Sequence, residues 1–258
     1  MNIALICPTR GRPDKFRRML ESARATATAG IETIHCYAAF TEGDASIPQY
    51  DVKSIQVLSH VTWPDYPTVH KWNMLAEWAM ADSCNKFFML AADDMIFSTR
   101  GWDAALREHY AALKNKIHVY ALQDSRDKDG TPHPIVTREY IKAMGYFLPP
   151  IFLHWYVDSW TVRAAKENDY FTHLRDYLLI HDKPSDRGQP DETHTRIRSM
   201  GWHDRDKWVA EKCEYLLKVE RMKLRCAIDG LEVHVIAAKT NHGGVELYPT
   251  VPLAKKME

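Results

Sequence analysis

FFMLAADDM, residues 87–95, is the stretch of sequence that decides the fold class of this chain. Its five leading apolar residues are typical of a strand that is buried on both faces, as the strands of parallel sheets are. The strand runs directly into Asp93 and Asp94. In open α/β sheets, ligands bind beyond the carboxyl ends of the strands, which is where this pair of carboxylates falls.

Two interpretations of the pair remain open on the residues alone. Adjacent carboxylates repel each other, and burial raises their pKa values, so Asp93 and Asp94 add little to the stability of a strand end. A divalent cation removes this conflict because carboxylate oxygens are hard ligands. Alternatively, the two side chains only cap the segment that follows.

Strands and helices alternate on either side of this stretch. Apolar residues recur at helical spacing over 16–23, 69–79 and 102–113. Strand patterns occur at 3–7, 34–40, 54–58, 87–91 and 119–122. The resulting order, β-α-β-β-α-β-α-β, predicts a Rossmann-like α/β fold with a mostly parallel sheet flanked by helices.

The second half of the chain is less regular. We expect helices over 137–144, ending at Gly145, and over 158–168, and a strand over 177–181. Residues 185–206 are polar and rich in turn formers, which predicts a loop. A long amphipathic helix follows around 208–222, and one or two strands lie within 231–252. We therefore expect one domain over 1–205, with halves 1–125 and 126–205, and a helical C-terminal extension, 206–258, packed on it.

Composition excludes several classes of protein. The chain has 258 residues, 34 basic and 34 acidic, and its formal net charge is zero, which gives no argument for a polyanionic partner. It has no run of the ~18 apolar residues that a membrane span needs, and the apolar run at 3–7 is too short for a secretory signal. The five cysteines form no CxxC pair. We expect no membrane partner and a reduced, cytoplasmic setting, in the host cytoplasm if a phage encodes the chain.

The turn after the first strand carries a candidate anion site. Pro8, Thr9, Arg10 and Arg12 lie between a strand and a helix, where backbone N–H groups and cations face a diphosphate well. Arginines at the start of a surface helix are also common, so this pattern by itself leaves both interpretations open.

ICPTRGRP, residues 6–13, resembles the donor loop of family-2-type GT-A glycosyltransferases. The helix with Lys71 and Asn73 stands where that family has an Asn-bearing helix, and Asp93 and Asp94 fall on its DxD motif. The resemblance spans roughly residues 1–205. It implies a UDP- or GDP-sugar donor contacted by the donor loop, Lys71, Asn73 and Asp93, and Mn²⁺ or Mg²⁺ bound by Asp94. The first position of the motif is Ala92, which departs from the family pattern.

The resemblance also assigns roles in the second half. Asp158 matches the position of the catalytic base that takes the proton of the acceptor hydroxyl, although the usual Glu-Asp pair is Val157-Asp158 here. His181 resembles the histidine that completes the metal shell in many GT-A enzymes. The residues alone also leave open that Asp158 is only a helix N-cap and that His181 is an ordinary surface residue. The polar segment 189–193 is a candidate lid.

Aromatic residues gather on the predicted acceptor side, where they either stack on a sugar or a base or form core. They are Tyr146, Phe147, Phe152, Trp155, Tyr156 and Trp160.

These observations predict a metal-dependent, inverting glycosyltransferase with a hydroxyl acceptor. One acceptor that fits is hydroxymethylated pyrimidine in DNA, because small transferases without an anchor are similar to bacteriophage enzymes that modify DNA. The arginines available for phosphate contacts are Arg17, Arg18, Arg24, Arg187, Arg196, Arg198 and Arg205. The alternatives are a nucleotidyltransferase of related fold, which the single glycine of the donor loop disfavours, and a non-catalytic nucleotide-sugar-binding module, which Ala92 favours.

Overall fold

Eight strands form one mixed sheet in the order β3-β2-β1-β4-β7-β6-β8-β5. The computed structural model describes residues 1–50, 57, 59–129, 132–167, 169–183, 192–229, 234–239 and 245–250. The strands of the sheet are β1 (Asn2–Thr9), β2 (Ile34–Thr41), β3 (Ser59–Trp63), β4 (Asn85–Leu90), β5 (Met95–Phe97), β6 (Val119–Asp124), β7 (Ile135–Thr137) and β8 (Phe171–His181).

Four pairings in the sheet are parallel and three are antiparallel. β3, β2, β1 and β4 pair in parallel, and so do β6 and β8. The short strand β7 joins the two parallel blocks by pairing antiparallel with β4 and β6, and β5 pairs antiparallel with β8. The strands predicted at 3–7, 34–40, 87–91 and 119–122 are confirmed. β5 and β7 were not predicted because three residues carry no measurable periodicity.

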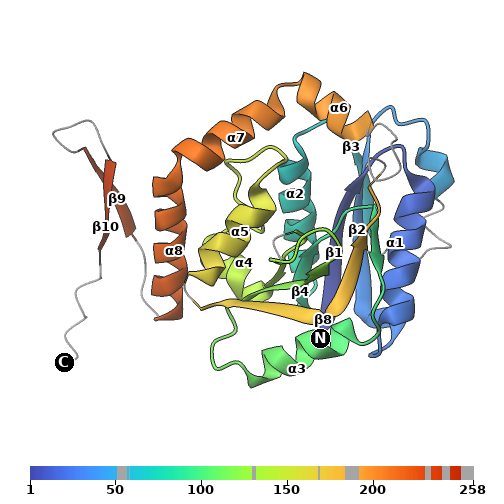
Figure 1. Ribbon diagram of the computed structural model, residues 1–258, viewed down its shortest axis with the longest axis horizontal. Helices are drawn as coiled ribbons and strands as arrows, with labels where there is room; N and C mark the ends of the chain where they lie inside the picture. The colour runs from blue at the N-terminus through green and yellow to red at the C-terminus, as the bar shows by residue number, and fades with distance from the viewer. Residues whose placement is uncertain are drawn as a thin grey trace.

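Helices cover both faces of the sheet, as Figure 1 shows with α1 on one side and α2, α4 and α5 on the other. Residues on alternate positions of β1 enter two separate core clusters, Ala4 and Ile6 in one and Ile3 and Leu5 in the other. This is why β1 is apolar throughout. The helices are α1 (Pro13–Thr26), α2 (Thr68–Met80), α3 (Trp102–Ala112), α4 (Arg138–Met144), α5 (Val157–Lys166), α6 (Glu192–Ser199), α7 (Trp202–Lys212) and α8 (Glu214–Ile228), with short 3₁₀ turns η1 (Ile31–Thr33) and η2 (Ile47–Tyr50).

The predicted loop over 185–206 is wrong for the residues that the structure describes. α6 occupies 192–199, and α7 begins at Trp202. The polar composition of α6 hides its single buried apolar side chain, Ile197, which is 1% exposed. One apolar contact per two turns gives too weak a periodic signal to separate a helix from a loop.

The long helix predicted around 208–222 is two helices, α7 and α8, with Cys213 between them. The break turns the chain, so Trp208 and Tyr215 are exposed rather than buried as the predicted stripe requires. The buried apolar side chains of this region are instead Val209, Cys213, Leu217 and Leu224, which join the cluster on the α2 side of the sheet. The predicted domain boundary at 205 falls inside α7.

Two further expectations concern the ends of the alternating pattern. The strand predicted at 54–58 lies outside the described residues except for Val57, and the third strand of the structure is β3. Near the C-terminus, β9 (His234–Lys239) and β10 (Val245–Thr250) pair antiparallel.

All five cysteines are free. No helix among the described residues has the length and apolar character that crossing a membrane requires.

Candidate active site

A cleft opens at the carboxyl ends of β1 and β4, which are neighbours in the sheet. Parallel pairing sets Ile6 opposite Leu90, so the turn after β1 and the residues after β4 lie together. Gly11 has a φ of 66°, which glycine adopts without strain, so the turn can fold back before α1 begins. Nine of the ten predicted site residues line this cleft: Pro8, Thr9, Arg10, Arg12, Lys71, Asp93, Asp94, Asp158 and His181.

Asp93 is held by the donor loop. Thr9 Oγ1 donates a hydrogen bond to its Oδ2 (2.7 Å), and Arg12 Nη1 donates to its Oδ1 (3.1 Å). The hydroxyl of the buried Tyr50 lies 3.1 Å from Thr9 Oγ1 and accepts from the backbone N–H of Arg12. Burial raises the pKa of Asp93 to about 6, against the lowering effect of the Arg12 charge.

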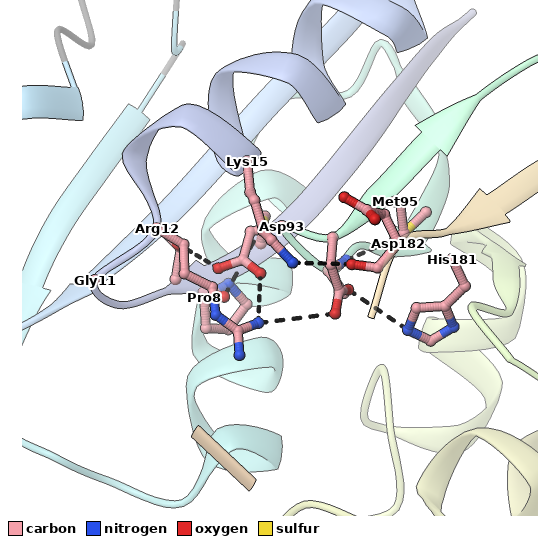
Figure 2. A network of polar contacts seen from close by, with 12 residues as sticks. Pro8, Gly11, Arg12, Lys15, Asp93, Met95, His181 and Asp182 are labelled. Carbon is pink, nitrogen blue, oxygen red and sulfur yellow. Dashed lines mark hydrogen bonds and ion pairs between the residues drawn. The ribbon is translucent and has the colours of Figure 1, made fainter. Parts of the chain in front are cut away.

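Asp94 bridges the donor loop and the far side of the cleft. Its Oδ2 lies 3.7 Å from Arg12 Nη1, and its Oδ1 lies 3.5 Å from His181 Nε2. Figure 2 shows the Arg12 guanidinium beside Asp93 and the His181 ring on the opposite side of the network. Burial raises the pKa of Asp94, but the hydrogen bond and charge of His181 outweigh it, and the pKa is well below its ordinary value. The pKa of Asp94 therefore lies below that of Asp93.

Strand pairing explains why His181 meets Asp94. β5 follows Asp94 directly and pairs antiparallel with the end of β8, where Met95 faces His181. The backbone N–H of Asp182 donates to the carbonyl oxygen of Asp94 (2.8 Å). On its other nitrogen, His181 Nδ1 lies 3.5 Å from Asp124 Oδ2. Burial lowers the pKa of His181, but the bonds to Asp124 and Asp94 raise it more.

Asp124 and His133 are site residues that the sequence did not reveal. Asp124 ends β6, which lies alongside β8. His133 is buried, and its ring centroid lies 4.9 Å from that of His181. One ligand atom each of Asp124, His133 and His181 lies within 4.8 Å of the others, so these three can hold a metal ion. An acid after an apolar strand was a usable signal for Asp124, whereas an isolated histidine between prolines gave none.

A third missed residue, Asp65, contacts three cations at the donor end of the cleft. Its carboxylate contacts Arg10 (3.3 Å), Lys71 (3.6 Å) and Arg196 of α6. Lys71 is 5% exposed, and its Nζ also donates to Thr41 Oγ1 (3.0 Å). Burial lowers the pKa of Lys71, and the neighbouring arginines act in the same direction, although Asp65 opposes them. Three cations on one carboxylate leave an excess of positive charge for an anionic ligand.

Asp158 lies on the opposite wall, in the first turn of α5. The N-cap of this helix is Tyr156, in the left-handed region with a φ of 66°, so Asp158 is not the N-cap. Its Oδ1 accepts from the backbone N–H of Ser159 (2.7 Å). Burial raises the pKa of Asp158.

The predicted aromatic group divides between cleft and core. Trp155 and Tyr156 line the cleft, whereas Phe147, Phe152 and Trp160 are each 1% exposed and belong to the core. Tyr146 packs against the same core and donates from its hydroxyl to Glu220 Oε1 (2.7 Å).

α6 lines the cleft next to Trp155. Thr193 and His194 line it, and the rings of His194 and Trp155 lie 5.5 Å apart. Thr193 is the last residue of the predicted lid, 189–193, of which 189–191 lie outside the described residues.

Asn73 is the predicted site residue that the structure does not bring to the cleft. Its Oδ1 accepts from the backbone N–H groups of Phe147 (3.1 Å) and Leu148 (2.8 Å), and its Nδ2 donates to the carbonyl oxygen of Leu148 (2.8 Å). These bonds occupy the amide and tie α2 to the segment after α4.

Comparison with known proteins gives matches in structure and none in sequence. No protein-family model matches the chain, and no curated protein matches it at a significant level. The mannosyltransferase PcManGT from Pyrobaculum calidifontis, in complex with GDP-Man and Mn²⁺, is similar over 89% of this chain and 74% of its own, with a TM-score of 0.58 and 12% identity.

Two other solved structures are similar over most of their length. S. aureus TarS, residues 1–349, in complex with UDP, matches over 97% of each chain with a TM-score of 0.52 and 10% identity. Glucosyl-3-phosphoglycerate synthase from Mycobacterium tuberculosis, in complex with Mn²⁺, UDP and phosphoglyceric acid, matches over 96% of this chain and 87% of its own, with a TM-score of 0.51 and 10% identity. The chain therefore has the GT-A fold of glycosyltransferases, as its sequence predicts.

Proposed function

We propose that this chain is a metal-dependent glycosyltransferase that moves a sugar from a nucleotide-sugar donor to a hydroxyl group. The observation that supports it best is the convergence in one cleft of cations, a carboxylate–histidine cluster and Asp158, contributed by separate strand ends, α2 and α5. Fold alone does not assign a reaction, so the proposal depends on this set of side chains.

The donor end of the cleft suits a nucleoside diphosphate. Arg10, Arg12 and Lys71 supply positive charge, and guanidinium groups bind phosphate oxygens bidentately. Asp93, beside Thr9, is the residue that we assign to the ribose. GDP-Man and UDP, the ligands of the similar structures, support a GDP- or UDP-sugar as donor.

The residues around His181 fit a divalent cation. Asp94 is the carboxylate ligand that the sequence predicts, Asp124 adds a carboxylate oxygen 3.5 Å from His181 Nδ1, and His133 adds imidazole nitrogens without a hydrogen-bond partner. Oxygen and imidazole ligands together suit Mn²⁺, with Mg²⁺ the other candidate. When bound, the ion stabilises the charge of the departing diphosphate.

Asp158 acts as the general base in this proposal. Its raised pKa favours proton transfer, because a base works best when its pKa lies near the working pH. Asp93 and Asp94 are engaged by Arg12, whereas Asp158 lies across the cleft on α5. One carboxylate that takes the acceptor proton is what an inverting transfer requires, so we propose inversion.

We assign the acceptor no chemical class beyond its hydroxyl group. Of the arginines expected to contact DNA, Arg18 pairs with Asp182, Arg196 with Asp65 and Arg205 with Asp206. These internal pairs reduce the free positive charge that phosphate contacts need. The DNA acceptor therefore stays a prediction without support from the cleft.

The first test is the melting temperature with a panel of nucleoside diphosphates, with and without Mn²⁺. Binding to the folded state raises the free energy of unfolding by mass action, by about 2.7 kcal/mol at a hundredfold excess over Kd, and so raises the melting temperature. We expect UDP or GDP to raise the melting temperature and Mn²⁺ to enlarge this rise. In Asp94→Asn, Mn²⁺ should no longer enlarge it. Absence of a shift with every nucleotide would remove the basis of the proposal.

The second test separates an enzyme from a binding module. Asp158→Asn should keep the nucleotide shift and lose at least about a hundredfold in Mn²⁺-dependent donor hydrolysis. Ser159→Ala, which keeps the backbone N–H that bonds Asp158, is the matched control. Nucleotide binding without hydrolysis or transfer by the unmodified protein would favour the non-catalytic alternative.

A further inference from the structure

Tyr50 is a fully buried residue whose hydroxyl joins the two ends of the turn between β1 and α1. Its oxygen lies 3.1 Å from Thr9 Oγ1, at the end of β1, and it accepts from the backbone N–H of Arg12 (3.1 Å), just before α1. Tyr50 is the last residue of η2, and it lies 41 residues from Thr9 and 38 from Arg12 along the chain. A segment outside the turn therefore fixes its shape.

The direction of these hydrogen bonds follows from the number of protons. Thr9 donates its one hydroxyl proton to Asp93 Oδ2 (2.7 Å), so its oxygen accepts the proton of the Tyr50 hydroxyl. Burial raises the pKa of Tyr50 more than its hydrogen bonds lower it, so the hydroxyl keeps the proton that it donates. The bonds run one way, from Arg12 through Tyr50 and Thr9 to Asp93, and bonds in such a chain strengthen one another.

The side chain of Arg12 closes this chain of bonds into a ring. Its Nη1 donates to Asp93 Oδ1 (3.1 Å), as Figure 2 shows, so the backbone and the guanidinium of one residue lead to the same carboxylate. Without the Tyr50 hydroxyl, the backbone N–H of Arg12 and the oxygen of Thr9 would both lose a partner. The orientation of Asp93 therefore depends on a residue that does not line the cleft.

Two phenylalanines hold the ring of Tyr50. Phe16 of α1 meets it edge-on with the ring centroids 5.6 Å apart, and the centroid of Phe40 of β2 lies 4.6 Å away. Both side chains are buried. Removing the hydroxyl alone leaves these contacts in place, so its hydrogen bonds can be tested separately from the packing of the ring.

We propose that Tyr50 is a positioning residue of the donor end of the cleft, where its hydroxyl orients Asp93 toward the ribose of a nucleotide. An ionised carboxylate accepts about four hydrogen bonds. Thr9 and Arg12 each bond one oxygen of Asp93, which leaves positions on both oxygens for the two neighbouring ribose hydroxyls. This role rests on the proposed function, in which Asp93 contacts the ribose.

Nucleotide affinity in Tyr50→Phe, compared between a ribonucleotide and its 2′-deoxy analogue, tests this role. Calorimetry with Mn²⁺ gives the affinities for UDP, GDP and their 2′-deoxy forms. We expect the unmodified protein to prefer the ribonucleotide by about tenfold, because the 2′-hydroxyl bonds a charged group. In Tyr50→Phe the ribonucleotide should bind more weakly, and the preference should fall to about threefold or less. A general loss of stability would not change this ratio.

Tyr140→Phe is the matched control. Tyr140 is also fully buried, but its hydroxyl has no hydrogen-bond partner among the described residues, so the variant should keep both affinities. Melting curves check the fold of each variant. Thr9→Val breaks the same chain of bonds at its next member. Combined with Tyr50→Phe it should weaken binding little further, because the effects of residues in one hydrogen-bond network are not additive.

Several results would overturn the proposal while the unmodified protein binds UDP or GDP, which leaves the proposed function standing. They are equal affinities of the unmodified protein for the ribonucleotide and its 2′-deoxy form, an unchanged ratio in Tyr50→Phe, equal losses in Tyr50→Phe and Tyr140→Phe, and effects of Tyr50→Phe and Thr9→Val that multiply. Absence of binding of either nucleotide to the unmodified protein removes the proposed function, and the role of Tyr50 with it.

Discussion

The two walls of the cleft are held in place in different ways. The donor wall is built at the ends of adjacent parallel strands, and Thr9 and Arg12 each donate a hydrogen bond directly to Asp93. The opposite wall, 153–158, belongs to no strand. Asp206 of α7 holds it, accepting from the backbone N–H groups of Leu153 (2.9 Å), His154 (2.7 Å) and Trp155 (2.9 Å).

A second buried carboxylate strengthens the opposite wall. Glu220 of α8 accepts from Trp160 Nε1 (2.8 Å) and from the Tyr146 hydroxyl, and Trp160 belongs to the same helix as Asp158. In the donor half, the fully buried Asp103 holds the segment after α1, and it does not line the cleft. The comparison teaches that sheet pairing shapes the donor wall, whereas helices far along the chain shape the other wall.

Among variants that compare the two walls, we expect Asp206→Ala to lower the free energy of unfolding most. The substitution leaves three backbone N–H groups without their acceptor, and we expect a loss of about 3–5 kcal/mol in the free energy of unfolding. Urea unfolding measures it. Asp204→Ala, on the same helix with a side chain 92% exposed, is the control and should change stability by less than about 0.5 kcal/mol. Equal stability of the two variants contradicts the assigned role of Asp206.

A smaller effect is expected for Asp103→Asn in the donor half. Asp103 accepts from the backbone N–H groups of Thr28 (2.8 Å) and Ala29 (3.0 Å) and pairs with Arg107. We expect a loss of about 2 kcal/mol at pH 7. Glu108→Gln, at an exposed position of the same helix, serves as control.

The pH dependence of that loss has a defined sign. Burial raises the pKa of Asp103, but its hydrogen bonds lower it more, so the folded-state pKa lies below the unfolded one. The ionised carboxylate therefore stabilises the fold above about pH 4 and loses this contribution as pH falls further. Unfolding at pH 7 and pH 3 should show the difference between Asp103→Asn and the unmodified protein shrinking. A difference that is independent of pH contradicts the assignment.

The smallest effect is expected for Asn73→Ala, which tests whether this residue belongs to the donor wall. Its amide bonds the backbone at 147–148, so we expect a loss of about 1–2 kcal/mol in stability and no change in nucleotide affinity. Lys71→Met, two residues away and in the cleft lining, should show weaker nucleotide binding instead. Weaker nucleotide binding in Asn73→Ala at unchanged stability would restore the donor-binding role implied by the family resemblance.

The sequence by itself determined the central parallel strands of the sheet and the donor edge. Apolar runs at 3–7 and 87–91 are long enough to reveal strands covered on both faces, and the chain places Asp93 and Asp94 at the end of one of them. Because the carboxyl ends of parallel strands meet at one edge of a sheet, local pattern was sufficient to bring Thr9 and Arg12 to these carboxylates.

Only the tertiary structure decided the cluster at His181 and the hydrogen bonds between Asp206 and the backbone of the opposite wall. Asp124 meets His181 because β6 and β8 pair, and His133 joins them from a segment with no periodic pattern. Asn73 and Asp206 bond to backbone groups 74 and 53 residues away. A side chain that bonds to backbone leaves no trace in the sequence of its partner, because every residue except proline offers the same N–H group.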